Sequence, residues 1–174
     1  MSSHGSIEVF GTMSVPSSLH DSIRRVQMSF IQGEGPCLTE EGTSGSYVLR
    51  DVSDCSNDHE GGSYTKPLAV WKPIDEEPFA PNNPRGMQAP FGSETCRPGV
   101  KSGESSIREV IAYVLDHEGF AGVPETTLVE VSHPSLKMDR LTESQVASDE
   151  FRNLISGYVS FKRQRKSNSN LVQN

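Results

Sequence analysis

The first regular pattern of apolar residues along the chain has helical spacing. It predicts a short amphipathic helix whose buried face is formed by Leu19, Ile23, Val26 and Phe30. Glycine and proline residues follow from Gly33 onward and end this helix. Residues 1–20 are rich in serine and glycine, so we expect a loose N-terminal segment there.

A second and stronger helical pattern lies between Gly103 and Gly119. Its apolar positions recur on one face and are Ile107, Val110, Ile111, Val114 and Leu115. Ser106 and Glu109 have the spacing of a capping box, although Ser102 or Gly103 would start the helix equally well. Gly119 is suited to end it, because glycine adopts the left-handed conformation found after helices.

Alternating residues between the two helices predict a hairpin with a long polar loop. Its strands are residues 46–51 and 67–72, and a third, β-branched strand, "TTLVEV", follows Pro124. Five prolines stand between Pro73 and Pro90, so we expect this connection to be extended and exposed.

The order strand, strand, helix, strand indicates an α+β fold. We expect a small antiparallel sheet with one helix packed across it, occupying residues 21–136. The pattern weakens afterwards, and residues 137–174 form a poorly specified segment with a basic tail. Both termini are predicted to be disordered.

Composition narrows the class of protein. The 174 residues are 33% hydrophobic and carry a net charge of −7, which gives no general attraction to nucleic acid. No apolar run is long enough to span a bilayer, and the N-terminus lacks the core of a signal peptide. We therefore expect a soluble, cytoplasmic protein. Its three cysteines are far apart without a CxxC pair, which favours free thiols.

The turn "GTSGS" ahead of the first hairpin strand is the first candidate for binding chemistry. Gly45 lies between Ser44 and Ser46, and such a turn lets backbone N–H groups and hydroxyls approach an anion closely. The same composition also makes an ordinary turn. It is not a P-loop, because no Gly-Lys-Ser/Thr follows.

Lys72 ends the second hairpin strand. Alternation puts Val70 and Lys72 on one face and Ala69 and Trp71 on the other. Val70 would then form an adenine-sized apolar floor with a cation just beyond it. Alternatively, the lysine stem only extends from the strand end into water.

A lysine held in a cleft needs a carboxylate partner, because an unpaired buried charge is costly. The second predicted helix offers Glu104 and Glu109. On a helical wheel Glu104 lies at the inward edge of the apolar stripe and Glu109 faces solvent, so we prefer Glu104, with Glu109 as its rival. Either glutamate would also interact favourably with the start of the helix dipole.

These stretches together resemble a known family. "LTEEGTSGSYVLRD", "AVWKPIDEEPFAPNNPRG" and "GESSIREVIAYVLDHEGFAGVPETTLVEVSHPSL" are similar to the N-terminal lobe of phosphatidylinositol 3/4-kinases, in particular type II-like, gamma-type phosphatidylinositol 4-kinases. The similarity runs from about Leu38 to Leu136, somewhat over half of the chain.

The resemblance implies roles for particular residues. Ser44, Gly45 and Ser46 match the tip of a glycine-rich loop over the phosphates of ATP, and Lys72 matches the lysine that holds them. Related kinases also have a glutamate at the position of Glu104.

The resemblance also implies a lipid partner. Glu77 and Pro78 match a segment implicated in phosphoinositide binding. The partners implied are therefore ATP with Mg²⁺, a phosphatidylinositol lipid and, through it, a peripheral membrane surface.

Other parts of the family pattern are missing. An Asp-Arg followed by an Asn, and a further metal-binding aspartate, belong to a second lobe in this family. Asp139–Arg140 has the right dipeptide, but Ser144 stands at the asparagine position, and no Asp-Xaa-Gly occurs. The stretch "SGYVSF" lacks the usual hinge pattern. We therefore expect a kinase N-lobe without a C-lobe, without phosphotransferase activity of its own.

Three hypotheses follow for function. The chain is the ATP-binding part of a phosphatidylinositol 4-kinase, a non-catalytic binding or regulatory kinase-like protein, or an unrelated α+β binding domain. The basic run "KRQRK" near the C-terminus would touch acidic lipid headgroups under the membrane hypothesis and is otherwise a solvated tail.

Overall fold

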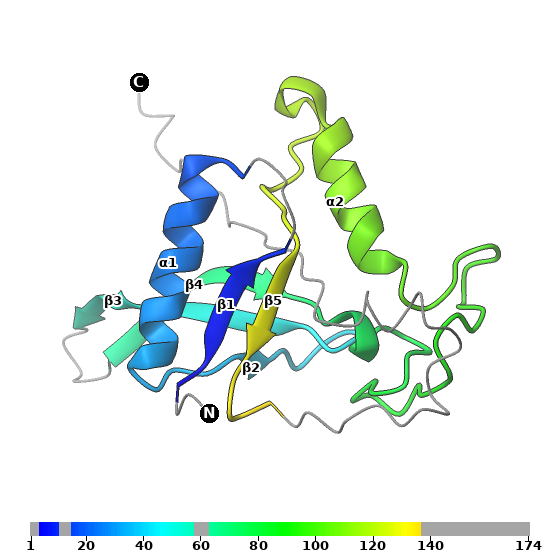
Figure 1. The fold of residues 1–174 in the computed structure, drawn as a ribbon, viewed down its shortest axis with the longest axis horizontal. Helices are drawn as coiled ribbons and strands as arrows, with labels where there is room; N and C mark the ends of the chain where they lie inside the picture. Colours follow the sequence, from blue (N-terminus) through cyan, green and yellow to red (C-terminus); the bar gives the residue numbers. More distant parts are fainter. Residues whose placement is uncertain (1–3, 11–14, 58–62, 137–174) are drawn as a thin grey trace, which may run out of the picture.

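The computed structural model describes residues 4–10, 15–57 and 63–136, and it shows an α+β fold as predicted (Figure 1). The elements in chain order are β1 (Ser6–Val9), α1 (Ser17–Ile31), β2 (Cys37–Leu38), β3 (Tyr47–Asn57), β4 (Ser63–Trp71), the 3-10 turn η1 (Ile74–Glu76), α2 (Ser105–Leu115), the 3-10 turn η2 (His117–Gly119) and β5 (Val129–Ser132). Within the described ranges, no helix is long and apolar enough to cross a membrane.

The predicted hairpin is confirmed as β3 and β4, which pair antiparallel with Tyr47 opposite Trp71. Both strands are longer than predicted and continue into the polar loop. The short strand β2 joins the free edge of β3, which gives a three-stranded antiparallel sheet in the order β2-β3-β4. The predicted alternation is also confirmed, since Ala69 and Trp71 are buried and Val70 is half-buried.

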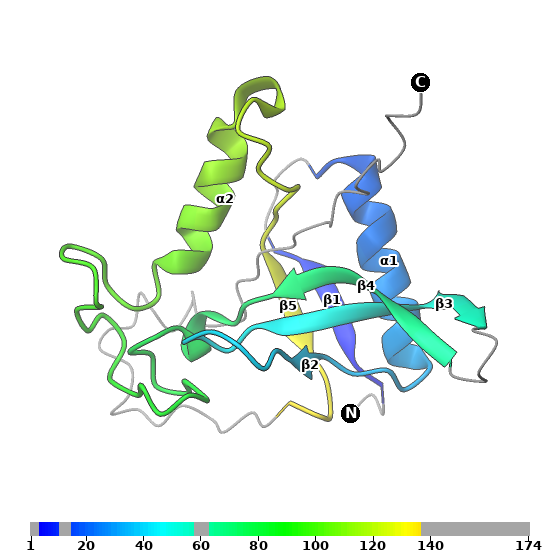
Figure 2. The same cartoon turned by 180° about the vertical axis from the view of Figure 1, so that it is seen from behind.

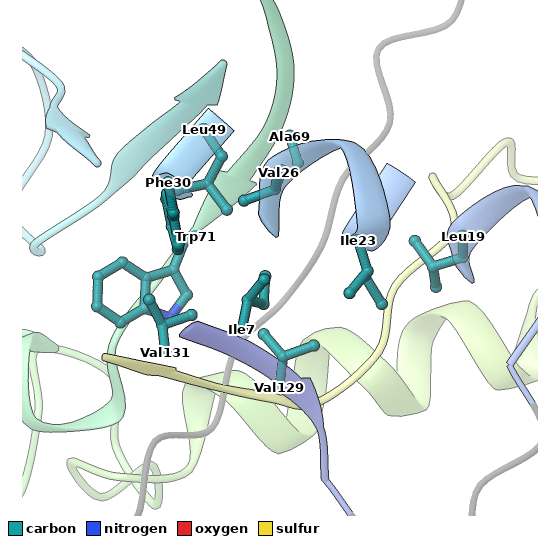
Figure 3. Close-up of a cluster of buried hydrophobic side chains, with 10 residues drawn as sticks. All are labelled: Ile7, Leu19, Ile23, Val26, Phe30, Leu49, Ala69, Trp71, Val129 and Val131. Carbon is teal, nitrogen blue, oxygen red and sulfur yellow. The ribbon is translucent and has the colours of Figure 1, made fainter. Parts of the chain in front are cut away.

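Helix α1 covers one face of this sheet (Figures 1 and 2). All four residues that predicted its buried face, Leu19, Ile23, Val26 and Phe30, are buried. They form the main core with side chains from every strand except β2 (Figure 3). Arg25 of α1 also forms an ion pair with the buried carboxylate of Asp51 on β3. Burial of this apolar stripe, at about 25 cal/mol per Å², is the main force that orders the sheet and α1.

The third predicted strand exists as β5, but it does not join the hairpin. It pairs antiparallel with β1, with Ile7 opposite Val131, in a separate two-stranded sheet. The expectation of a loose segment over residues 1–20 is wrong at this point, because it contains β1 and the start of α1. A four-residue strand with two apolar positions gives little signal by itself, and it is stabilised here by β5 and α1.

The helix packed across the sheet is α1, and the expectation that the second predicted helix would do so is wrong. Helix α2 lies to one side of both sheets (Figures 1 and 2). Of its apolar residues only Val110 is buried, whereas Ile111 is 48%, Val114 63% and Leu115 74% exposed. Helical periodicity showed that an apolar face exists, but it carried no information about what covers that face.

The proline-rich connection between β4 and α2 is folded instead of extended. A small second cluster buries Ile74, Ala80 and Phe91 within it. Prolines remove N–H donors and restrict φ, but they leave the side chains between them free to pack. The segment that follows β4 is therefore folded around a small apolar cluster of its own.

Candidate functional site

A cavity of about 490 Å³ lies where the end of β4 meets the N-terminal half of α2. The turn before β3 contributes Thr43 and Ser44, β4 is followed by Lys72, and α2 contributes Ser105 and Glu109. A fourth wall comes from residues 95–100, a hairpin closed by a bridge between Glu94 and Lys101. Hydroxyl groups and cations from segments far apart in the sequence thus line the same cavity.

Lys72 forms an ion pair with Glu109 across this cavity, with 2.6 Å between Nζ and Oε1. The side chains are 30% and 26% exposed, so solvent screens the pair only in part. The alternative partner, Glu104, instead accepts a hydrogen bond from Arg108 at 3.0 Å, which holds its pKa below the usual value. The preference for Glu104 is therefore wrong, and the rival Glu109 is the partner of Lys72.

The error came from the assumed orientation of α2. Its buried residues are Ser106 and Val110, on the side that carries Glu109, whereas Ile111 and Val114 face outward. The expected capping box is also absent. Glu104 is the residue before the helix, and no side chain of the cap forms a capping hydrogen bond there.

The carboxylate of Glu77 occupies the N-terminal end of α2. It accepts backbone N–H bonds from Gly103 at 2.7 Å, Ser105 at 3.3 Å and Ser106 at 3.1 Å. Burial raises the pKa of Glu77, and these three backbone donors lower it in part. Glu77 and Pro78 both line the cavity, but the oxygens of Glu77 are already engaged by protein donors.

The glycine-containing turn is tied to the segment after β4. The N–H of Gly45 donates to the carbonyl of Glu76 at 2.9 Å. A Cβ atom on Gly45 would lie 1.9 Å from Glu76 Oε2, so glycine is required here by the close approach of Glu76. The hydroxyls of Ser44 and Ser46 lie 3.3 Å apart, and Ser44 is the one of these three residues that lines the cavity.

Glu76 itself is held by Tyr47, whose hydroxyl donates toward both carboxylate oxygens at 3.1 and 2.9 Å. Burial raises the pKa of Glu76 to about 7, with a smaller opposing effect from the Tyr47 hydrogen bond and a further increase from the nearby Asp75. Burial and the neighbouring Glu76 likewise raise the pKa of Tyr47. The carboxyl group beneath the turn is thus close to its titration point at neutral pH.

Asn83 was not selected from the sequence, although it joins three parts of the site. Its side-chain amide donates to the carbonyls of Thr43 at 2.8 Å and of Glu76 and Glu77 at 3.1 Å. Its Oδ1 accepts the backbone N–H of Arg85 at 2.9 Å, and the side chain is buried. An asparagine two residues before "RG" signals a turn, but not these distant contacts.

The other described residues predicted for the site are not found at the cavity. Val70 is half-buried and does not line the cavity, so its role beneath an adenine stays a prediction. Asp139–Arg140, Ser144, the stretch "SGYVSF" and the basic run lie outside the described residues. Within the described ranges, no group of three or more His, Cys, Asp or Glu side chains is arranged to hold a metal ion. Free thiols are confirmed for Cys37 and Cys96.

Comparison with known proteins agrees with the family resemblance. Phosphatidylinositol 4-kinase gamma 4 of Arabidopsis thaliana is 35% identical over 146 residues, which are 77% of this chain and 24% of that protein. Phosphatidylinositol 4-kinase gamma 8 of the same plant is 38% identical over 73% of this chain and 22% of its own length. Phosphatidylinositol 4-kinase gamma 6, also from Arabidopsis thaliana, matches 91% of this chain at 32% identity.

Over the matched part, the chain is similar to phosphatidylinositol 4-kinases of the gamma type. It spans about a quarter of the length of the curated relatives it matches. No model of a known protein family matches the chain, and no solved structure matches it.

Proposed function

We propose that this chain provides the ATP-phosphate side of a phosphatidylinositol 4-kinase-type site. The observation that carries the proposal is the ion pair between Lys72, at the end of a strand, and Glu109, on the following helix, inside a cavity. In protein kinases a strand lysine paired with a helix glutamate is part of the apparatus that holds the ATP phosphates. The similarity to phosphatidylinositol 4-kinases supports the same use here.

The groups around the cavity fit a polyphosphate. Lys72, Arg97 and Arg108 line it as cations, and Thr43 and Ser44 bring hydroxyl groups. Lys72 would donate to phosphate oxygens while Glu109 keeps its ammonium group in place. Charge-assisted hydrogen bonds of this kind are about twice as strong as neutral ones.

The described residues supply binding and charge for this reaction, and ATP supplies the phosphoryl group. The two carboxylates that line the cavity, Glu77 and Glu109, both have protein partners, which leaves neither suited to orient an attacking hydroxyl. Mg²⁺ would need ligands beyond the described residues, because these contain no cluster suited to it. We therefore propose that the chain binds ATP without transferring its phosphate to phosphatidylinositol unaided.

Isothermal titration of the full chain with Mg-ATP tests this proposal. We expect Lys72→Met to weaken binding by about tenfold, a loss of about 1.4 kcal/mol, because one charge-assisted contact to phosphate is removed. Lys66→Met removes the same charge from β4, the strand that Lys72 follows, but away from the cavity, and this variant should bind ATP as the unaltered chain does.

Two outcomes would overturn the proposal. One is an absence of saturable ATP binding by the unaltered chain, and the other is equal affinity for the Lys72 and Lys66 variants. A separate assay with phosphatidylinositol vesicles and radiolabelled ATP measures transfer, and labelling above background would contradict the expectation of binding without turnover.

A further inference from the structure

Glu77 lies between the end of β4 and the start of α2 and is 3% exposed. Besides the three backbone N–H groups of residues 103–106, the hydroxyl of Ser106 donates to it at 3.3 Å. Four donors therefore converge on one carboxylate. Two of the backbone donors belong to the first turn of α2, where a helix has unsatisfied N–H groups and a positive dipole end.

Apolar packing does little to fix the position of α2. Ser106 and Val110 are its buried residues, and its larger apolar side chains, Ile107, Ile111 and Leu115, are 37%, 48% and 74% exposed. Most helices in proteins are held by an apolar face, so this helix depends to an unusual degree on its polar contacts. The contact between Glu77 and Ser106 joins two buried residues, which are 3% and 2% exposed.

The contacts of Glu77 and the Lys72–Glu109 pair are linked through short stretches of chain. Glu77 follows Lys72 by five residues, and Ser106 precedes Glu109 by three. Residues three apart lie on the same face of a helix, so Ser106 and Glu109 face the end of β4 together. A displacement of the first turn of α2 would move Glu109 with it.

We propose that Glu77 is a positioning residue, which anchors α2 so that Glu109 reaches Lys72 and the phosphate site is assembled. The resemblance assigned this residue to the lipid substrate, whereas its oxygens point at the helix start and accept protein donors. The inference deepens the proposed function and rests on it for its consequence in ATP binding. The effect on Lys72 itself does not require ATP.

Glu77→Gln is the most informative variant, because it keeps the size of the side chain and replaces one acceptor oxygen with an NH₂ donor. That donor would face backbone N–H groups, which cannot accept a hydrogen bond. Glu104→Gln is the matched control, since Glu104 is also a glutamate at the start of α2 but is exposed and bonds to Arg108. Glu109→Gln gives the reference for complete loss of the partner of Lys72.

The first measurement follows the ¹³C signal of reductively methylated Lys72 by NMR, without nucleotide, in the full chain. We expect Glu77→Gln to shift this signal in the direction seen for Glu109→Gln, and the double variant to add no further shift. Glu104→Gln should leave it in place. An unchanged Lys72 signal in folded Glu77→Gln protein would overturn the inference.

The second measurement is Mg-ATP affinity by titration calorimetry. We expect Glu77→Gln and Glu109→Gln each to weaken binding by about tenfold, and the double variant to lose about as much as either alone. Additive losses would mean that the two residues act separately and would contradict the inference. If the unaltered chain binds no ATP, the proposed function fails, while the Lys72 signal still decides the role of Glu77.

Glu77→Asp is a second variant that tests the same inference if Glu77→Gln protein does not fold. The shorter carboxylate keeps the charge and draws the helix start toward β4 or loses donors, so the Lys72 signal should again move. A signal identical to that of the unaltered chain in this variant also contradicts a positioning role.

Discussion

Gly45→Ala tests directly why a glycine stands in the turn before β3. The new Cβ would lie 1.9 Å from Oε2, 2.7 Å from Cβ and 2.9 Å from Cδ of Glu76. Contacts under 3.0 Å are essentially never seen for real Cβ atoms, so the Glu76 side chain and the adjoining backbone must move. The hydroxyl of Tyr47 would then lose its carboxylate acceptor, and the N–H of Gly45 would lose the carbonyl of Glu76.

The size of the effect follows from these two losses. Above pH 7 Glu76 is mostly ionised, because its pKa is about 7. A hydrogen bond to a charged group then contributes about 1.5–3 kcal/mol and a neutral backbone bond about 0.5–1.5 kcal/mol. We therefore expect Gly45→Ala to lower the free energy of unfolding by about 2–4.5 kcal/mol. Urea unfolding followed by the fluorescence of Trp71 suits this measurement, because Trp71 is the single tryptophan and packs 5.1 Å from the Tyr47 ring.

A double-mutant cycle separates the clash from other effects. In Glu76→Ala protein the contacts to Oε2 and Cδ no longer exist, so Gly45→Ala should destabilise this background by about 1–2 kcal/mol less than it destabilises the unaltered chain. Gly42→Ala is the control in the same turn. Its φ of 100° makes alanine strained, but nothing lies within 4 Å of the new Cβ, so it should not couple to Glu76.

The reasoning is refuted if Gly45→Ala costs less than about 0.5 kcal/mol, or if its coupling to Glu76→Ala is zero within about 0.5 kcal/mol. Either result would mean that Glu76 does not press on this turn. The glycine would then be better explained by the approach of a phosphate to its backbone.

Two further predictions concern the orientation of α2 and the titration of Glu76. Val110→Ala should lower the free energy of unfolding in urea by about 1–2 kcal/mol, because Val110 is buried. Val114→Ala, at a site 63% exposed, should change this free energy by less than about 0.5 kcal/mol. If Val114→Ala were the more destabilising of the two, the outward face of α2 would be the packed one. Because burial raises the pKa of Glu76 from 4.5 to about 7, the folded protein holds a proton between these pH values that the unfolded chain has released. The unaltered chain should therefore lose stability relative to Glu76→Gln as pH rises from about 5 to 7. The loss is at most about 3 kcal/mol, and solvent screening of Glu76 makes it smaller. If the difference in stability between the two proteins stayed the same across this range, the raised pKa would be contradicted.

The elements of the fold were largely determined by local sequence patterns. The apolar spacing of α1 identified its four buried residues, and the alternation in β4 placed Trp71 in the core and Lys72 on the opposite face. These inferences succeeded because helices and strands impose fixed periods on the side chains they bury. Lys72, which follows the end of β4, is one of the residues that line the cavity.

What covers each apolar face was decided by the tertiary structure. The sequence showed an apolar stripe on α2. The folded chain buries Val110 of this stripe and leaves its other four residues exposed, while α1 covers the sheet. For the same reason Glu109, on the side opposite Val114, became the partner of Lys72. Periodicity reports the relative orientation of residues within one element, and only contacts between elements determine how that element is turned.

The polar connections of the site were likewise invisible in the sequence. The contacts of Glu77 with the start of α2, of Asn83 with the turn and of Glu76 with Gly45 join residues from 6 to 40 positions apart. Hydrogen bonds between such distant residues produce no repeating pattern in the sequence, because each depends on one donor and one acceptor that the fold brings together. The sequence by itself determined the two helices, the hairpin and the lysine that follows it. The tertiary structure decided that Glu109 pairs with this lysine, because a charge in a cleft needs a partner and only the fold brings one within reach.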